Sequence, residues 1–235
     1  MKKRLKTNGF LIFIAAILVI ILPDIFLRRP DGSYTSQFVK ILGFAFILSG
    51  QVLRACGRGY KSEHSKEGHS LIQGGPYSFV RNPMYLGILL IGLGVVMMLF
   101  NWWVAAVFLC IFIWRYILLM LAEEKKLLTL FGGEYKSYTK NVPRLIPAAF
   151  VIFTKDIAEY FPLKISWLKK EAGSMLAVAL ATLFFAAWQD FQSKDIRICL
   201  DDAAGLLAVI IITTALVIYL IRRTKQQRKH ATGKS

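Results

Sequence analysis

Apolar residues gather in six long runs along the chain, separated by polar segments. Each run has few charges and is near the roughly 20 residues that a helix needs to cross the hydrocarbon core of a bilayer. The runs are Gly9–Leu27, Phe38–Leu53, Met84–Phe100, Trp102–Ala122, Ala172–Trp188 and Ala203–Ile221. The pattern predicts an all-α fold: a polytopic membrane helix bundle of about six transmembrane helices. The first run is expected to be a span rather than a signal peptide, because it is too long for the apolar region of such a peptide.

The polar segments between these runs explain the formal net charge of +16. With both termini in the cytoplasm, the segments on that side hold 24 of the 30 lysines and arginines. Cytoplasmic loops of membrane proteins collect these residues. The sequence therefore predicts a multi-pass membrane protein with both termini cytoplasmic and a basic rim that attracts anionic lipid headgroups. The basic charge is thus assigned to the membrane, and no nucleic-acid partner is expected.

A very short connection, Phe100–Trp103, joins the third and fourth runs. Two helices joined in this way form a tight hairpin. The start of the third helix and the end of the fourth must then lie side by side at the cytoplasmic face. The polar stretch "HSLIQGGPYSFVRNPMYLG", residues 69–87, is therefore expected to contact the segment Ala122–Pro147.

Glycine and proline predict where these two segments bend. Gly74-Gly75-Pro76 cannot continue a helix. Asn82 is expected to cap the third helix, with Pro83 at its first position, and the free N–H groups there favour carboxylates and phosphates. The fourth helix is expected to run past Glu123 and Glu124 and to end at Gly132-Gly133.

The sequence after this break is predicted to be mostly irregular up to the next span. Glu134–Tyr138 is expected to form one further turn before Pro143. The apolar stretch Ala148–Phe161 contains a few charges and predicts a helix that lies in the membrane interface.

Arg115 is a charge within a predicted span, which marks a candidate functional residue. On a helix, positions 115, 119, 122 and 123 share a face, so Arg115 and Glu123 are expected on one stripe. The alternative is that Arg115 extends toward the headgroups and has no further role.

Each polar residue near the hairpin also has a structural explanation. Tyr85 is typical of the aromatic belt at a membrane surface, and Arg81 is typical of the cytoplasmic boundary of a span. The Glu123-Glu124 pair is compatible with a solvated helix end. The occurrence of all of them at one place favours a functional site. The three histidines and three cysteines of the chain show no metal-ligand spacing, so no metal site is predicted.

The sequence "GGPYSFVRNPMYLG", followed by a hairpin and then "EEKKLLTLFGGEYKSYTKNVPRLIP", resembles the isoprenylcysteine carboxyl methyltransferase family and its wider phospholipid methyltransferase group. The family pattern is roughly G-x-Y-x-x-x-R-H-P-x-Y-x-G, then E-E-x-x-L-x-x-x-F-G-x-x-Y-x-x-Y and a proline-containing end. The resemblance covers about residues 40–147. Two motifs in the right order, with a helical hairpin between them, make it specific.

The resemblance implies an integral membrane methyltransferase that uses S-adenosyl-L-methionine and acts on a lipophilic acceptor from the bilayer. The cofactor pocket would face the cytoplasm. By position, the cofactor-binding residues would be His69, Ser70, Leu71, Ile72, Tyr77, Asn82, Pro83, Met84, Tyr85, Glu123 and Glu124. The candidate catalytic residues are Arg81, Arg115 and Glu124.

The chain departs from the family pattern at two positions. Asn82 replaces a histidine, and Asn does not titrate near neutral pH. Leu119 stands where members that methylate prenylcysteine carry an arginine, and Arg115, one turn deeper, is the candidate replacement. The resemblance divides the chain into a methyltransferase core, residues 1–147, and a C-terminal part, residues 148–235, with an interfacial helix and two further spans.

Two other functions compete with this interpretation. An NADPH-dependent membrane reductase of the sterol-reductase type would need basic residues for its phosphates, and Arg54, Arg58, Lys61 and Arg81 could supply them. A six-span binding or transport protein without catalytic activity is the other alternative. The methyl acceptor (oxygen, nitrogen or sulfur) and the oligomeric state stay open at this point.

Overall fold

The computed structural model describes residues 19, 21–28, 33–65, 70–147, 157–193 and 196–232. Over these residues the chain is helical, with one isolated bridge between Leu27 and Phe100. The helices are α2 (Pro23–Phe26), α3 (Tyr34–His64), α4 (Pro76–Phe79), α5 (Pro83–Leu99), α6 (Trp102–Asn141), α8 (Ile157–Tyr160), α9 (Ile165–Ser193) and α10 (Ile196–Thr232). The predicted all-α class is confirmed for this part of the chain.

Four of these helices, α3, α6, α9 and α10, are long and apolar enough to cross a membrane. Helix α5 is apolar but only 17 residues long. Five of the six predicted apolar runs are thus found within helices. Most of the first run, Gly9–Leu27, lies outside the described residues, and the count of six spans stays a prediction.

Helix α3 extends well beyond the apolar run that predicted it. It begins after Ser33, whose hydroxyl accepts a hydrogen bond from the Ser36 N–H at 3.2 Å, as a helix cap does. It continues past Leu53 to His64 and is about 46 Å long at 1.5 Å per residue. Its charged end is stabilised by packing, since Gly59 lies directly against the Trp167 ring of α9. Helix α3 therefore extends beyond the apolar run Phe38–Leu53 into charged sequence.

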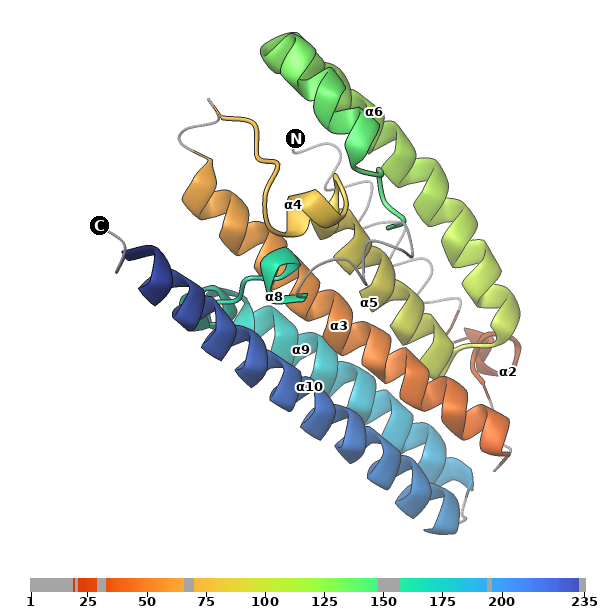
Figure 1. Cartoon of the computed structure of the whole chain (residues 1–235). Helices are drawn as coiled ribbons and strands as arrows, with labels where there is room; N and C mark the ends of the chain where they lie inside the picture. Colours follow the sequence, from red (N-terminus) through yellow and green to blue (C-terminus); the bar gives the residue numbers. More distant parts are fainter. Residues whose placement is uncertain are drawn as a thin grey trace.

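The long helices lie side by side: α6 packs on α5, α5 packs on α3, and both α9 and α10 pack on α3 (Figure 1). Helices α3 and α5 touch through their backbones. A Cβ added to Gly50 would lie 2.6 Å from the Gly87 carbonyl oxygen, and one added to Gly94 would lie 2.3 Å from that of Gly43. Small residues allow this approach in membrane helices. The Phe44 and Ile47 side chains of α3 pack in a core that also includes residues of α5, α9 and α10.

Two polar contacts attach the C-terminal hairpin of α9 and α10 to α3. The Lys40 ammonium lies 2.6 Å from the Asp202 carboxylate of α10, and both side chains are almost fully buried. The Gln51 amide donates to the Met175 carbonyl of α9 at 3.1 Å. The hairpin is thus attached to α3 at two positions along the length of that helix, Lys40 and Gln51.

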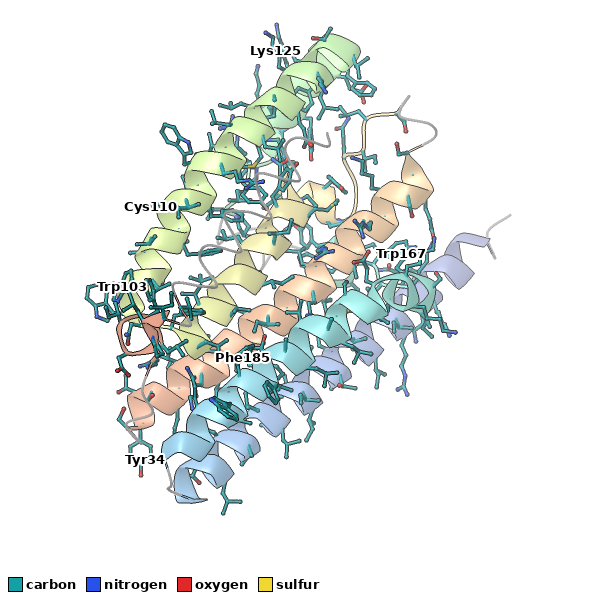
Figure 2. The ribbon with its side chains drawn as sticks, turned by 180° about the vertical axis from the view of Figure 1, so that it is seen from behind. Tyr34, Trp103, Cys110, Lys125, Trp167 and Phe185 are labelled. Carbon is teal, nitrogen blue, oxygen red and sulfur yellow. The ribbon has the colours of Figure 1, made fainter. Side chains whose placement is uncertain are left out.

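Helix α6 lies at the edge of the bundle. Its outer face is exposed, with Trp102 at 85% and Trp114 at 76% exposure. Figure 2 shows Trp103, Cys110 and Lys125 spaced along it. The start of α6 is held at the hairpin by the Asn101 amide, which donates to the Ile25 carbonyl at 2.8 Å. The predicted tight hairpin between α5 and α6 is therefore present.

The predicted break in α6 is located correctly, but the chain beyond it differs from the expectation. Gly132 has a φ of +50°, outside helical geometry, and the axis kinks there. The helix then resumes and continues to Asn141, so the single further turn predicted over Glu134–Tyr138 was too short. The reason is burial, because Tyr135 and Tyr138 on this last part are only 3% and 6% exposed.

The predicted interfacial helix, Ala148–Phe161, lies mostly outside the described residues. Its described end, α8, is packed inside the protein. Ala158 and Tyr160 are 0% and 4% exposed, and the Tyr160 ring packs 5.6 Å from that of Phe79 in α4. The described end therefore packs into the protein core, and the interfacial helix as a whole stays a prediction.

Candidate functional site

A cavity of about 170 Å³ lies where the end of α3, the segment 70–82 and the second half of α6 meet. Its lining consists of Lys61, Ser65, Ser70, Leu71, Ile72, Tyr77, Arg81, Asn82, Glu123, Glu124, Leu127, Leu130, Phe131, Tyr135 and Tyr138. The two polar segments predicted to be neighbours thus form one site. The hairpin argument is confirmed.

Gly75 shapes the segment that carries half of the lining. Its φ is +57°, a conformation that other L residues rarely adopt. A Cβ at this position would lie 2.7 Å from the Tyr60 ring of α3. The turn leads directly into Pro76 at the start of α4, which carries Tyr77. Glycine at position 75 therefore lets this segment pack closely on α3.

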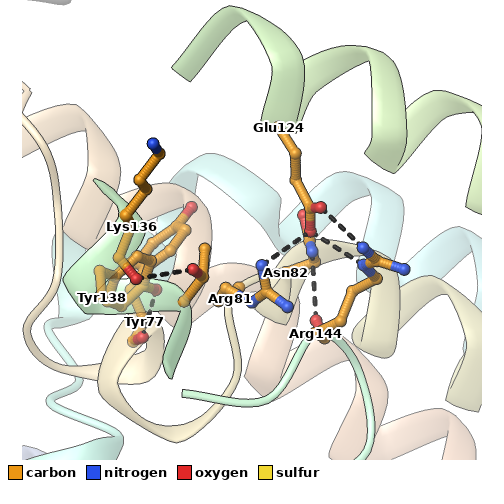
Figure 3. A network of polar contacts seen from close by, with 8 residues as sticks. Tyr77, Arg81, Asn82, Glu124, Lys136, Tyr138 and Arg144 are labelled. Atoms are coloured by element: carbon orange, nitrogen blue, oxygen red, sulfur yellow. Dashed lines mark hydrogen bonds and ion pairs between the residues drawn. The ribbon is translucent and has the colours of Figure 1, made fainter. Parts of the chain in front are cut away.

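Glu124 is surrounded by two arginines (Figure 3). Arg144 donates from Nε to Oε1 at 2.9 Å and from Nη2 to Oε2 at 2.8 Å. Arg81 Nη1 lies 3.1 Å from Oε1. Such bidentate, charge-assisted contacts are among the stronger hydrogen bonds in proteins, and the bond to Glu124 raises the pKa of Arg144. The Glu124 carboxylate is therefore occupied by protein groups.

Backbone contacts hold the segment around Arg144 against the start of α5. The Arg81 N–H donates to the Pro143 carbonyl at 2.8 Å, and the Asn82 amide donates to the Arg144 carbonyl at 3.1 Å. Asn82 occupies the N-cap position of α5, as predicted, with Pro83 next. The predicted cap itself was wrong: the Asn82 side chain makes no capping hydrogen bond, because it is turned toward Arg144.

Glu123 has a different environment from its neighbour. Its Oε1 accepts a hydrogen bond from the Tyr85 hydroxyl at 2.8 Å. The Tyr85 ring packs edge-on against Tyr116, which stacks on Phe112 with 4.1 Å between ring centroids. Within the described part of the chain, no cation pairs with Glu123. It therefore places an uncompensated negative charge on the cavity wall.

The tyrosines of the site act mainly as hydrogen-bonded wall residues. The Tyr138 hydroxyl donates to the Tyr77 carbonyl at 2.6 Å. The Tyr77 hydroxyl lies 3.4 Å from the Gly57 carbonyl. Burial, reinforced by the charge of Glu123, raises the pKa of the Tyr77 hydroxyl. Tyr77 therefore stays protonated at neutral pH and does not act as a base.

Two buried donors in the lining lack a protein acceptor. Arg81 and the Tyr135 hydroxyl lie close enough to interact with each other, but among the described residues neither Arg81 Nε nor that hydroxyl makes a well-formed hydrogen bond. Buried polar groups are almost always paired, so an orphaned pair in the lining needs an explanation. An anionic ligand group in the cavity would provide acceptors for both.

The structure brings together most of the predicted cofactor residues but not all of them. The lining includes Ser70, Leu71, Ile72, Tyr77, Asn82, Glu123 and Glu124, together with the predicted catalytic residue Arg81. The lining does not include Pro83, Met84 or Tyr85. Pro83 and Met84 pack against Gly57 of α3, and Tyr85 lies behind Glu123. His69 lies outside the described residues.

Arg115 is exposed on α6 and does not line the cavity. The face of α6 that meets α5 carries Tyr116 instead. The four basic residues considered for NADPH do not form one cluster either. Arg54 and Arg58 pair with Glu171 of α9, and only the other two line the cavity.

Several site residues were not predicted. They are Lys61, Ser65, Leu127, Leu130, Phe131, Tyr135, Tyr138 and Arg144. Leu127, Phe131, Tyr135 and Tyr138 recur at helical spacing within the second motif, which was the available signal. Lys61 was considered only as a possible phosphate-binding residue of the reductase alternative, and the hydropathy pattern ends the helix before it.

Residues 38–134 match the model of the phospholipid methyltransferase family. Three curated relatives are each named protein-S-isoprenylcysteine O-methyltransferase. The protein from Schizosaccharomyces pombe is 32% identical over 112 residues, that from Xenopus laevis 29% over 119, and that from Saccharomyces cerevisiae 26% over 155. These alignments cover 43%, 47% and 62% of this chain.

The chain spans 47%, 41% and 64% of the lengths of these three relatives. No solved structure matches it significantly. All lining residues of the cavity except Tyr135 and Tyr138 fall inside the matched segment. The resemblance predicted from the two motifs is thus confirmed: residues 38–134 are similar to the phospholipid methyltransferases, and parts of the chain are similar to three isoprenylcysteine O-methyltransferases.

Proposed function

We propose that the protein is an integral membrane methyltransferase that transfers a methyl group from S-adenosyl-L-methionine to a lipophilic acceptor. One observation carries this proposal. The cavity, most of whose lining falls inside the segment that matches the methyltransferase family, presents the Glu123 carboxylate, which no cation among the described residues pairs with, and two buried donors, Arg81 Nε and the Tyr135 hydroxyl. Opposite charges on one wall complement the amino-acid part of this cofactor, which has both an ammonium and a carboxylate.

The residues of the cavity fit the cofactor in chemical type. Its carboxylate would pair with Arg81 and Tyr135, and its ammonium or ribose hydroxyls with Glu123. Leu71, Leu127 and Phe131, which pack against Tyr135 and Tyr138, offer an apolar wall for the adenine. Pockets that enclose whole ligands measure about 300–1,000 Å³. The volume of about 170 Å³ therefore suits part of the cofactor, with the rest extending past Leu130, which is 70% exposed.

The bound cofactor would supply a methyl group on a sulfonium. The chain would contribute position rather than acid–base chemistry: most of the rate in such a displacement comes from aligning the reactants and excluding water. The protonated Tyr77 belongs to the wall, and the faces of the tyrosines can hold a cation. Glu124 would act by holding Arg81 and Arg144 in place, as a positioning residue.

The acceptor is proposed to enter from the bilayer, and the cofactor from the cytoplasm, in a bundle of six spans with both termini cytoplasmic. The relatives' names specify an isoprenylcysteine, and the family description specifies phospholipids. Both chemistries are proposed for this chain only as the class of lipophilic acceptors. Arg115 is exposed on the apolar part of α6, where an acceptor carboxylate could reach it. Its role stays a prediction.

The proposal is tested by calorimetric titration of S-adenosyl-L-methionine into the detergent-purified full chain. We expect micromolar binding. Glu123→Gln should weaken it by about tenfold or more, because hydrogen bonds to charged groups contribute about 1.5–3 kcal/mol. The matched control is Glu134→Gln, since Glu134 is exposed on the same helix and its side-chain partner among the described residues is Gln73, which does not line the cavity. Absence of binding to a folded wild-type protein would refute the proposal.

A further inference from the structure

A second polar cluster lies on the other side of α3, at its contact with α9. The Glu171 carboxylate, which is almost fully buried, is shared by two arginines of α3. Arg58 Nη1 contacts Oε1, and Arg54 Nη2 lies 3.4 Å from Oε2. The Ser174 hydroxyl lies 3.3 Å from the same Oε2. Two guanidinium groups thus share one carboxylate, and the cluster keeps a net positive charge.

The arginines still have donors to offer. A guanidinium has five N–H groups in a planar fork, and in the described part of the chain each of these two contacts only Glu171. The Arg58 side chain is 56% exposed and that of Arg54 is 29% exposed. The cluster is therefore anchored by a buried carboxylate and open to an anion from outside.

A small hollow next to this cluster is bordered by α3, α5 and α9. Arg54, Gln51 and Glu171 form its polar side, and Ile91, Met175 and Val178 form its apolar side. Its volume of about 10 Å³ is too small to enclose a molecule, so a ligand would lie along it rather than inside it. The hollow therefore marks a shallow groove that presents both polar and apolar side chains.

The sequence places a change from polar to apolar residues at the membrane boundary. On α3, Arg54 directly follows the apolar run Phe38–Leu53, and on α9, Glu171 directly precedes the run Ala172–Trp188. Both helices therefore pass from charged to apolar residues at the same level. Lipid headgroups occupy this depth, and basic residues near the surface attract anionic ones.

We propose that Arg54 and Arg58 bind the phosphate of a membrane phospholipid, with one acyl chain lying in the groove along Ile91 and Val178. Guanidinium groups match phosphate oxygens in geometry and charge. The apolar side chains of the groove favour a lipid over a free anion. This site shares no residue with the cavity described above, so it stands apart from the proposed methyl transfer.

The first test is native mass spectrometry of the detergent-purified full chain with added phosphatidylglycerol. The variant is Arg54→Gln/Arg58→Gln/Glu171→Gln, which avoids leaving a buried carboxylate unpaired. It lowers the net charge by one. The matched control is Lys169→Gln, which removes one charge from an exposed position on α9 near Glu171. We expect about a tenfold loss of bound lipid in the triple variant and little change in the control. Equal retention in both would overturn the proposal.

A second variant, Glu171→Gln, changes lipid binding in the opposite direction. It removes the carboxylate that competes for both guanidinium groups, so the lipid should bind more tightly. Weaker binding in a folded Glu171→Gln protein would contradict the proposal. If the Glu171→Gln protein does not fold, thermal unfolding provides the test instead. Added lipid should raise the melting temperature of the wild type but not that of the triple variant. Inorganic phosphate is the competitor: if it displaces the lipid at equal concentration, the groove contributes nothing and the lipid assignment is wrong.

Discussion

Arg144 and Glu124 are joined by two parallel hydrogen bonds, from Nε to Oε1 and from Nη2 to Oε2, at 2.9 and 2.8 Å. This pair connects the segment after α6 to the middle of α6 itself. It also positions Arg81, whose Nη1 forms an ion pair with the same Glu124 carboxylate. The wall of the cavity therefore depends on a residue that does not line it.

Substitution of Arg144 should loosen the cavity wall. Arg144→Gln is expected to lower the free energy of unfolding by about 1–2 kcal/mol, since the pair is partly buried but Arg144 is more than one-third exposed. Arg144→Lys should not restore it, because an ammonium cannot form the two-pronged contact. Thermal unfolding in detergent measures both. Full stability of Arg144→Lys would contradict the importance of the bidentate geometry.

The adjacent residues Glu123 and Glu124 should respond differently to the same change. Glu124→Gln removes a carboxylate that pairs with two arginines, so we expect a lower melting temperature. Glu123→Gln removes a carboxylate that contacts only a tyrosine hydroxyl, so the melting temperature should change little while cofactor affinity falls. Parallel measurements of melting temperature and dissociation constant separate these effects. Identical behaviour of the two variants would show that the environments do not differ in this way.

Gly132 and Gly133 form a natural matched pair. A Cβ at either position would meet nothing within 4 Å, but only Gly132 has a positive φ, at +50°. Gly132→Ala should therefore destabilise the protein by about 1–3 kcal/mol through backbone strain. Gly133→Ala should be neutral or slightly stabilising, since alanine favours the helix. Chemical denaturation of the two variants provides the comparison, and equal stability would argue against the kink.

The buried pair Lys40 and Asp202 links α3 to α10. Lys40→Met alone leaves a buried carboxylate without this partner, which typically costs about 3–5 kcal/mol. Lys40→Met/Asp202→Leu removes both charges and should recover most of the loss. Unfolding of the two variants in detergent measures the difference. A double variant as unstable as the single one would mean that the pair does more than neutralise charge.

The relation between the two motifs could be predicted because it depends only on topology. Two helices joined by a short turn bring the start of α5 near the part of α6 that follows Ala122, and the Tyr85 hydroxyl of the first is hydrogen-bonded to Glu123 of the second. The contact of Arg144 could not be predicted in this way. It depends on the direction of the chain after Gly132, and a glycine allows many directions.

Helix ends and helix faces were less predictable. Lys61 lines the cavity because α3 continues through charged residues, stabilised by packing on α9 that hydropathy does not report. Arg115 and Glu123 were expected on one stripe, but eight residues on a helix of 3.6 residues per turn return only approximately to the same face. Tyr116, next to Arg115, faces α5 instead. The kinds of residue in the site were thus easier to predict than the full set of residues that line the cavity.

The backbone contact between α3 and α5 has a consequence for how ligands reach the cavity. At Gly50 and Gly87 there is no room for even a methyl group, so neither helix can rotate or slide without a clash. These two helices behave as a single rigid wall. Any opening must come from α6 or from the segment 70–82, which are held by side-chain hydrogen bonds such as that of Tyr138 to Tyr77. An opening motion of this kind would therefore break contacts made by tyrosine hydroxyls and leave those made by glycine backbones intact.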